Sequence, residues 1–305
     1  MPSLRQFEYL VALEEHLHFR RAAEFCGVSQ PTLSAQLCVL EDRLGAQLVE
    51  RSRTRVLMTP FGTEIAAVAR RILRDVEEMR HLADRPGTGI GGTVRLGLAP
   101  TVGPYLLPKM IPDLHATYPD LKLHVREGFP DALPPALEEG RHDVLIVPLP
   151  VDRKELVTEA VFREPLYLAM AADHPLAIRK RISRRDLRGQ SILMLESGHQ
   201  LHHQVESLCA EVGAHPLSDY EGTSLDTLRE MTGMGMGLSF LPGLFVRSNL
   251  MQDREIKVVE LRGPPIYRII GMVWRTSSAR GEEFRTLAEH CRTTVRREFP
   301  EFTIV

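Results

Sequence analysis

Residues 18–44, HFRRAAEFCGVSQPTLSAQLCVLEDRL, decide how the first part of this chain folds. Four apolar residues early in this stretch recur at helical spacing, namely Phe19, Ala22, Ala23 and Cys26. The spacing predicts a short helix with one apolar face, whose small side chains allow a second helix to cross closely. Gly27 supplies the backbone freedom that a tight turn requires. We therefore expect a helix, a turn and a second helix.

The second helix should begin at Gln30, because Ser29 is placed to cap it and Pro31 is tolerated in a first helical turn. Its inner face is a leucine stripe at helical spacing, formed by Leu33, Leu37, Leu40 and Leu44. The stripe would pack on the small apolar face of the preceding helix, which leaves the opposite side of the second helix exposed.

The exposed N-terminal half of this helix carries short or amide side chains, namely Gln30, Pro31, Thr32, Ser34 and Gln36. Helix N-termini present free N–H groups to phosphate, and hydroxyl and amide side chains can read base edges in a major groove. The pattern favours a DNA-binding helix-turn-helix in which these five residues contact the duplex. A helical hairpin with a merely polar outer face has the same spacing, so that alternative stays open.

Two further segments complete a small domain over residues 1–58. Residues 4–14 predict a first helix that faces the hairpin. After Gly45, two short runs of strand character predict a two-stranded wing. The turn of this wing carries Arg51, Arg53 and Arg55, which alternate with hydroxyl residues and could lie along a phosphate backbone. An ordinary solvated hairpin is the alternative, but its position after a recognition helix favours DNA contact by Arg51 and Arg53.

A long linker helix is expected from Thr59-Pro60 to about Ala83, because a capping residue followed by proline opens helices. Apolar residues recur along it at spacings of three and four, at Ile65, Val68, Ile72, Val76 and Met79. Such a seam predicts a coiled coil with a second copy, which would place two recognition helices on successive major grooves about 34 to 36 Å apart. Burial of the seam on the following domain is the alternative. The linker ends in a glycine-rich hinge, so this segment spans residues 59–91.

Residues 92–305 change to alternating strands and helices, which predicts an α/β domain with a parallel sheet and helices on both faces. Strands are expected at 93–99, 121–127, 143–149, 166–172, 191–197, 237–241 and 266–275. Helices are expected at 105–117, 132–139, 201–212, 224–234 and 281–297. We expect two lobes, about 92–163 with 268–305 and about 164–267, on either side of a cleft.

The composition restricts the class of protein. The 305 residues include 38 basic and 40 acidic side chains, so a nucleic-acid site must be local rather than a property of the whole surface.

No run of eighteen apolar residues and no signal-peptide pattern occurs, which predicts a cytoplasmic protein without a membrane partner. The four cysteines are scattered and do not form a zinc-ligand pattern, and no cofactor motif is found. No nucleophile elbow, phosphate loop or zinc-protease motif occurs either, so no catalytic residue is predicted and the chain is not expected to be an enzyme.

The run FEYLVALEEHLHFRRAAEFCGVSQPTLSAQLCVLEDRLG, followed by LVER, TP-FG and a long helix, resembles the LysR-type transcriptional regulators. Within that family, APTVGPYLLP, LMLESGH, TSLDTLREM and GLSFLP are similar to the OxyR peroxide sensors. The resemblance implies an all-α winged helix-turn-helix, a dimerising linker helix and a two-lobed regulatory domain like the periplasmic binding proteins. It further implies a homodimer or homotetramer that binds double-stranded promoter DNA, an activator of oxidative-stress genes, and contact with RNA polymerase.

The resemblance also implies an effector or redox pocket, with one decisive departure. Peroxide sensors carry a reactive cysteine directly after the Gly-His of this motif, and this chain carries Gln200 there, while Cys209 stands at the resolving position. A glutamine amide cannot form a sulfenic acid, so no disulfide can join the two positions. Thr101 matches the hydroxyl residue that helps to hold peroxide in the family. His199 matches the imidazole next to the reactive cysteine, and Arg268 matches the cation that lowers the pKa of that thiol. His203 stands in place of an aspartate and Pro130 in place of a threonine.

Several interpretations of this pocket remain open. Thr101, Gln200 and Arg268 could converge on a small anionic ligand, with help from the helix that begins near Leu201. Cys209 is flanked by acidic residues, which disfavours a reactive thiol and favours a structural one. A metal interpretation of His199, His202, His203 and Cys209 is disfavoured, because adjacent histidines on a helix are expected to point apart. A solute-binding protein or an enzyme with the same two-lobed cleft is the alternative from another class.

Overall fold

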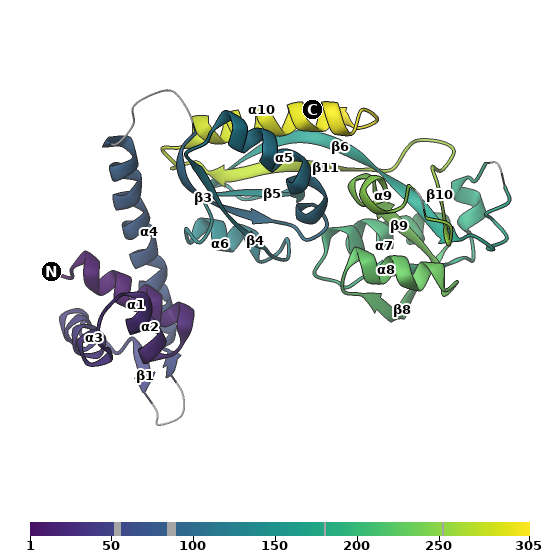
Figure 1. The fold of residues 1–305 in the computed structure, drawn as a ribbon. Coiled ribbons are helices and arrows are strands. Elements are labelled where there is room, and N and C mark those ends of the chain that lie inside the picture. The colour runs from purple at the N-terminus through teal and green to yellow at the C-terminus, as the bar shows by residue number, and fades with distance from the viewer. Residues whose placement is uncertain (52–55, 84–89, 180, 252) are drawn as a thin grey trace. The chain divides into compact units, whose positions relative to one another are not determined.

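The computed structural model describes residues 1–51, 56–83, 90–179, 181–251 and 253–305. The chain divides into two compact units, residues 1–88 with 139–141 and residues 89–138 with 142–305 (Figure 1). We call them the DNA-binding unit and the regulatory unit, and describe each by itself.

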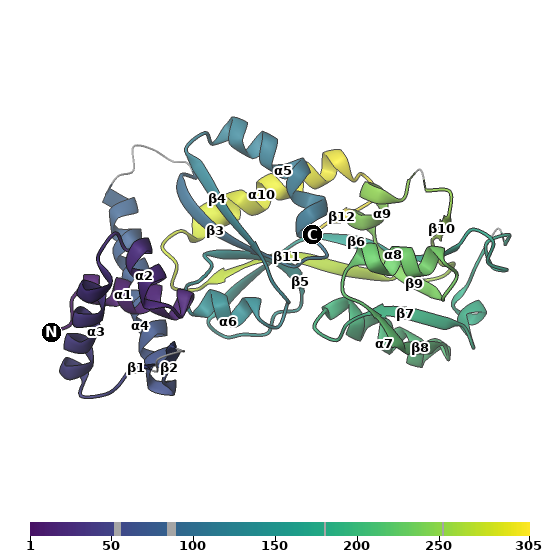
Figure 2. The same cartoon turned by 60° about the horizontal axis from the view of Figure 1, so that its bottom comes forward.

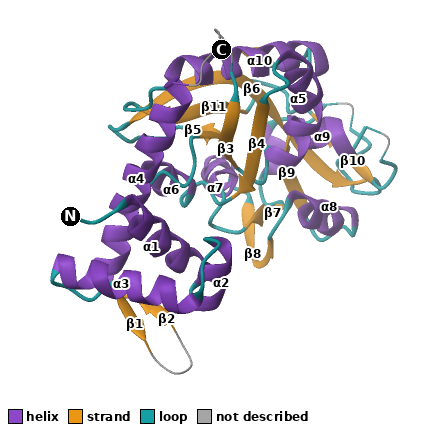
Figure 3. Ribbon diagram, turned by 60° about the vertical axis from the view of Figure 1, so that its left-hand side comes forward, coloured by secondary structure: helices purple, strands orange, loops and turns teal. Residues whose placement is uncertain are grey.

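The DNA-binding unit contains four helices and a two-stranded antiparallel sheet among its described residues (Figure 3). Its elements are α1 Leu4–His16, α2 Phe19–Phe25, α3 Gln30–Leu44, β1 Val49–Arg51, β2 Val56–Met58 and α4 Pro60–Ala83. The core contains Ala22 and Ala23 from α2 and the buried leucines 33, 37 and 40 of α3, as their spacing predicts. The helix, turn, helix and wing expected from the sequence are therefore all present.

The start of α3 follows directly from its sequence. Ser29 Oγ accepts a hydrogen bond from the Thr32 amide at 3.3 Å and lies 2.8 Å from the Thr32 hydroxyl. Pro31 occupies the first turn, where it removes no intrahelical hydrogen bond. The helix ends at Leu44 and is capped by Gly45, whose φ of 66° is in the left-handed region that glycine adopts at little cost.

The linker helix α4 starts where predicted, with the Thr59 hydroxyl accepting a hydrogen bond from the Gly62 amide at 2.9 Å. It packs on α1, where Arg70 forms an ion pair with Glu14. The predicted seam is not covered along its whole length, because Val68 is 40% and Met79 is 68% exposed.

The regulatory unit contains one ten-stranded mixed sheet that spans two lobes. In the first lobe, β3 Gly92–Leu98 pairs in parallel with β4 Leu121–Glu127 and with β5 Val144–Leu149. The helices α5 Gly103–Thr117 and α10 Gly281–Glu298 cover one face of these strands, and α6 Leu133–Glu138 covers the other (Figure 2).

In the second lobe, β7 Ser191–Leu195 lies between β8 His215–Gly222 and β9 Leu238–Pro242, and all three strands are parallel. Helix α7 Gln200–Val212 packs on β7 and β8, and α8 Leu225–Gly233 packs on β6, β7 and β9. Helix α9 Gly243–Asn249 follows β9 directly, and its Phe245 ring meets Tyr105 of α5 edge to face at 5.3 Å.

The predicted parallel pairing is confirmed for β3, β4 and β5 and for β7, β8 and β9, but it does not extend to the strands that cross between the lobes. The strand β6 Leu156–Ala171 runs for 16 residues through both lobes and pairs antiparallel with β11 Tyr267–Arg275 and with β9. Because a single long strand crosses between the lobes, its partners on the two sides need not share its direction. Several elements were not predicted, namely β8, α9, β10 Ile256–Val259, β12 Thr303–Ile304 and the 3-10 helix Arg184–Leu187.

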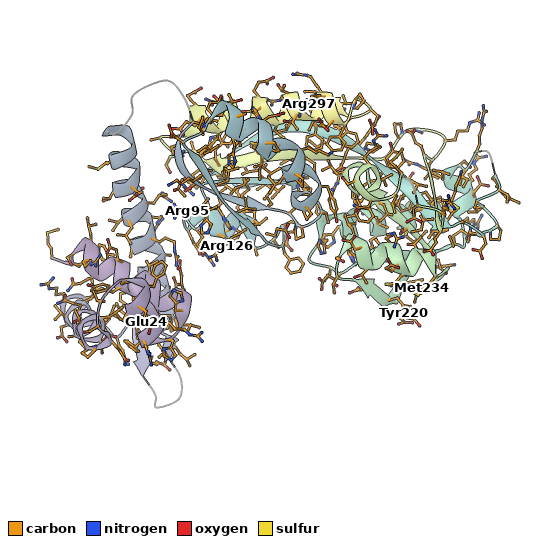
Figure 4. The ribbon with its side chains drawn as sticks, in the orientation of Figure 1. Glu24, Arg95, Arg126, Tyr220, Met234 and Arg297 are labelled. Atoms are coloured by element: carbon orange, nitrogen blue, oxygen red, sulfur yellow. The ribbon has the colours of Figure 1, made fainter. Side chains whose placement is uncertain are left out.

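Side chains fill the space between these ribbons (Figure 4). The only tryptophan of the chain, Trp274 on β11, is 2% exposed and belongs to the regulatory core. Arg95, labelled in Figure 4, pairs with Asp143 at 2.8 Å and ties β3 to the start of β5. Among the described helices, none combines the length and the apolar character needed to cross a bilayer.

Candidate functional site

The predicted DNA-contacting residues do not all have the same exposure. Gln30, Pro31 and Thr32 are exposed at the first turn of α3, whereas Ser34 and Gln36 are half-buried. The side-chain oxygen of Gln36, Oε1, accepts a hydrogen bond from Nε2 of Gln6 on α1 at 3.1 Å. The first turn is therefore the part of α3 that is open to a groove, while Gln36 also helps to hold the helix in place.

The wing arginines cannot be placed. The backbone of Arg51 ends strand β1, but its side chain lies outside the described part of the structure, and so does the whole of Arg53. Their contact with a phosphate backbone remains a prediction.

Thr101 and Arg268, predicted from the sequence to share a pocket, are in direct contact. Arg268 donates from Nη1 to the Thr101 hydroxyl at 2.8 Å and from Nη2 to the Thr101 carbonyl at 2.7 Å. The third nitrogen, Nε, donates to Glu164 Oε1 at 2.6 Å. The other oxygen of Glu164 accepts from the Leu244 amide at 2.7 Å. These bonds join the first lobe, the crossing strands β6 and β11, and the start of α9.

The guanidinium of Arg268 is therefore already neutralised inside the protein. The Glu164 side chain is fully buried, and burial raises its pKa while Arg268 and the Leu244 amide favour its charged form. All three nitrogens of Arg268 donate to protein oxygens, and neither Arg268 nor Thr101 lines the cavity that Gln200 lines. Arg268 instead holds the two lobes together next to the pocket.

The helix α7 opens beside this network with two unsatisfied polar atoms. His199, the residue before the helix, is 2% exposed, and its Nε2 has no hydrogen-bond partner. The same holds for the buried Oε1 of Gln200. Glu196 lies 4.0 Å from His199 Nε2, beyond hydrogen-bond distance. Burial lowers the pKa of His199, so the imidazole is neutral at physiological pH.

The hydrogen-bonding character of both atoms can be assigned. The neutral His199 ring carries one hydrogen, and the nearby backbone of Thr223 favours a hydrogen on the ring by raising its pKa. Because Nε2 has no partner to donate to, we assign the hydrogen to Nδ1, which leaves Nε2 as an acceptor. Gln200 Oε1 is also an acceptor. The start of α7 thus presents two buried acceptors to whatever small molecule reaches it.

Gln200 and His203 also line a cavity of about 370 Å³ between the lobes. Its wall is rich in proline and valine, and its charged members are Asp131, Asp152 and Arg153. Arg153 forms an ion pair with Glu138 at 3.0 Å, so the cavity has no excess of positive charge. Nearby, the Phe129 ring meets His199 edge to face at 5.1 Å. The first lobe therefore reaches across to the start of α7.

Cys209 lies on the inner face of α7 and is 1% exposed. Burial raises the pKa of its thiol to about 11, so the reactive thiolate is scarce at neutral pH. Cys209 follows Gln200 by nine positions, which corresponds to about 13.5 Å along the helix axis. These observations agree with a structural cysteine. All four cysteines are free.

The histidines behave differently from the prediction that they diverge. His202 is nearly buried, and its Nδ1 lies 2.7 Å from the Leu195 carbonyl, while His203 is exposed on the adjacent side of α7. Their rings nevertheless approach to 5.4 Å between centroids, and Glu206 one turn further on joins them. Neighbouring residues leave a helix in different directions, but rotation about the side-chain bonds brings the two rings back together. The prediction from spacing considered only the directions of the residues and not their rotamers.

Two residues of this region were missed by the sequence reasoning. Glu164 lies in the run VFREPLYLAM, where a carboxylate inside an apolar strand signals a buried partner. The strand expected at 166–172 began too late to include it. Phe129 carried no signal, because its contact with His199 depends on how the two lobes meet.

The comparison with known protein families decides the identity of the chain. The description "LysR substrate binding domain" matches residues 87–296, and "Bacterial regulatory helix-turn-helix protein, lysR family" matches residues 4–63. The chain belongs to the LysR family. It is an OxyR-like, LysR-type DNA-binding transcriptional regulator.

Individual relatives of this LysR-type regulator cover nearly its whole length. The "DNA-binding transcriptional dual regulator OxyR" of Escherichia coli K12 is 41% identical over 290 residues, 95% of each chain. A full-length Pseudomonas aeruginosa OxyR structure with a cysteine-to-aspartate substitution is 36% identical with a TM-score of 0.80, covering 95% of this chain and 94% of that chain. A Corynebacterium glutamicum OxyR cysteine-to-serine mutant, described as H2O2-bound, is 30% identical with a TM-score of 0.67, covering 99% and 96%. The named relatives are regulators rather than enzymes.

Proposed function

We propose that this regulator acts in the cytoplasm as a homodimer or homotetramer that binds promoter DNA. The first turn of α3 would enter the major groove, and the wing would follow the phosphate backbone. The exposed apolar residues of α4 support pairing with a second copy, because a coiled-coil seam left in water is unfavourable. Contact with RNA polymerase would follow if the regulator activates transcription.

We further propose that its regulatory unit senses a small neutral molecule that carries O–H donors, with H2O2 as the first candidate, and that it controls oxidative-stress genes. The ligand would bind without a covalent bond at the start of α7. The observation that carries this proposal is the pair of buried acceptors without partners, His199 Nε2 and Gln200 Oε1. Buried acceptors of this kind cost about 1–3 kcal/mol each when nothing donates to them, so an O–H donor is favoured.

The same chemistry disfavours the small anion considered from the sequence. A carboxylate or sulfate has only acceptor atoms and cannot satisfy two acceptors. Within the described residues, the nearby cations Arg268 and Arg153 are already paired with Glu164 and Glu138. Hydrogen peroxide carries two donors and two acceptors, and it therefore matches the start of α7 better.

Relatives support the choice of ligand. Several are named hydrogen peroxide-inducible genes activators, and the C. glutamicum structure described as H2O2-bound has a cysteine replaced by serine. If this protein responds to peroxide, it does so without forming a disulfide, because Gln200 has no thiol and Cys209 is buried. Phe129 of the first lobe contacts His199, so a ligand bound at the start of α7 would change the contact between the two lobes.

Operator affinity with and without peroxide tests this proposal. We would measure fluorescence anisotropy of a labelled promoter fragment with the full-length protein, add H2O2, and then remove the peroxide with catalase in the absence of any thiol reductant. A noncovalent ligand predicts a change in affinity that catalase alone reverses. A change that persists until a thiol reductant is added would show cysteine oxidation and overturn the noncovalent mechanism.

Two variants locate the response. Gln200→Leu removes the acceptor and should abolish the peroxide response while operator affinity without peroxide is retained. The matched control is Gln204→Leu, one turn further along α7, whose amide bonds the Tyr267 carbonyl. Loss of the response in both variants, or in neither, would contradict a ligand site at Gln200. A protein that ignores every promoter fragment at low salt would contradict the DNA-binding function itself.

A further inference from the structure

We propose that His202, His203 and Glu206 on α7 form a binding site for a divalent transition metal ion of the Zn²⁺ class. In the described part of the chain this is the one cluster of three or more histidine, cysteine and acidic residues whose ligand atoms come together. The ligand atoms of the three side chains lie within 4.8 Å of one another.

The spacing on the helix explains why the three side chains meet. Glu206 follows His202 by four residues and His203 by three, and residues three and four apart are neighbours on a helix surface. Ligands of a tetrahedral zinc ion lie about 2.0–2.2 Å from the metal, so their atoms are about 3.4 Å apart. His203 and Glu206 are exposed, so their side chains can change rotamer when an ion binds.

His202 is already prepared as a ligand. Its Nδ1 lies 2.7 Å from the Leu195 carbonyl oxygen, which can only accept, so Nδ1 must carry the hydrogen. With the hydrogen on Nδ1, the nitrogen that can bind a metal ion is Nε2. A ligating histidine typically donates its other N–H to a carbonyl or carboxylate in this way, which fixes the ring and increases its basicity. The Leu195 carbonyl at the end of β7 thus supplies the supporting contact that metal-binding histidines require.

The donor set indicates the class of metal. Two imidazoles and one carboxylate suit Zn²⁺ and its neighbours rather than Mg²⁺ or Ca²⁺, which prefer oxygen ligands throughout. Three protein ligands leave one position of a tetrahedral ion for water. Because His203 also lines the cavity between the lobes, this open position would be accessible from solvent.

Isothermal titration of ZnCl₂ into the tag-free full-length protein tests the site. Cys26 and Cys38 are half-buried thiols that could bind zinc independently, so the titration uses a Cys26→Ser/Cys38→Ser background. The test variants are His203→Asn and Glu206→Gln, whose exposed side chains can be replaced without disturbing the core. The matched controls are His215→Asn and Glu211→Gln, an exposed histidine and an exposed acid of the same lobe that lie outside the cluster.

The proposal predicts one bound Zn²⁺ per chain, with an affinity that falls by at least about tenfold in each test variant and stays within about twofold in each control. Equal affinity in the test variants and the parent would overturn it, and so would the absence of saturable zinc binding in the parent. The emission of Trp274, buried in the same unit, confirms that each variant is folded. Because the titration contains neither DNA nor peroxide, its outcome is independent of the proposed sensing function.

Discussion

Helices α3 and α7 both begin with a glutamine, Gln30 and Gln200, but the two first turns lie in opposite surroundings. Gln30 is exposed, and the preceding Ser29 caps the helix through its side chain. Gln200 is half-buried, and the preceding His199 makes no capping bond. One helix start is locally complete and faces outward, whereas the other has unsatisfied atoms inside the protein.

This difference separates two functions that use the same local structure. A capped and exposed helix start can lose a side chain without loss of fold, so its residues are free to contact a large partner. A buried start with two unpartnered acceptors is unfavourable until a small molecule donates to them. The first arrangement suits recognition of a duplex, and the second suits detection of a ligand.

The largest effect is expected next to the start of α7. Arg268→Met would leave the buried Glu164 carboxylate without its cation, and we expect the free energy of unfolding to fall by about 3–5 kcal/mol. Urea unfolding followed by the fluorescence of Trp274 measures it, since this single tryptophan reports only on the regulatory unit.

Two controls accompany this variant. Arg297→Met breaks an exposed ion pair in the same unit and should leave the free energy of unfolding nearly unchanged. The loss of unfolding free energy in Arg268→Met should become smaller in mildly acidic buffer. The pKa of Glu164 is raised by burial, so as the pH falls protonation removes the unpaired charge. Equal stability of the two arginine variants would show that the Arg268 network does not hold the lobes together.

The next effect concerns the outward-facing helix start. Gln30→Ala and Thr32→Ala should each reduce discrimination between operator and scrambled DNA by about 1–3 kcal/mol if the side chain contacts a base. Arg51→Ala and Arg53→Ala should instead weaken binding to both sequences alike. Anisotropy titrations with the operator duplex and the scrambled duplex give the affinity of each variant for each sequence. If the helix and wing variants behaved identically, α3 would not be the element that reads sequence.

Loss of the cap should have a smaller effect. Ser29→Ala removes the acceptor for the Thr32 amide and should destabilise the DNA-binding unit by about 1 kcal/mol, whereas Ser29→Gly should cost only a few tenths. Amide hydrogen exchange across α3, with α10 of the other unit as internal reference, measures the change. Faster exchange spread equally over α3 and α10 would argue against a local capping effect.

Almost no effect is expected at Cys209. Its burial predicts that a thiol reagent labels Cys209 and Cys291 only after unfolding, while Cys26 and Cys38 react in the native protein. Peptide mass spectrometry after labelling identifies the modified thiols. Rapid native labelling of Cys209, or its oxidation by micromolar peroxide, would restore the single-thiol mechanism that the structure disfavours.

The sequence predicted the DNA-binding unit well because its signals are local. The leucine stripe of α3, the Ser29 cap and the Gly45 stop each depend on neighbours within a few residues. The same is true of α7, expected from Leu201 to Val212 and found one residue longer at its start.

The regulatory site was predicted only in part because its contacts join distant segments. The family resemblance placed Thr101 and Arg268 in one pocket, and the two residues are in contact. Glu164, which pairs with Arg268, lies on a strand whose start was placed too late. The antiparallel course of β6 and β11 depends on pairing between segments about 100 residues apart, which no short pattern encodes. The approach of His202 and His203 depends on rotamers, which spacing does not determine.

A crystal structure of the protein soaked in H2O2, with all cysteines kept reduced, would show whether peroxide binds at the start of α7 without a covalent bond. We expect elongated electron density for one H2O2 molecule whose O–H groups donate to His199 Nε2 or Gln200 Oε1. In an unsoaked crystal a water molecule should take its place. Identical density at the start of α7 in both crystals, together with an oxidised cysteine in the soaked one, would contradict it.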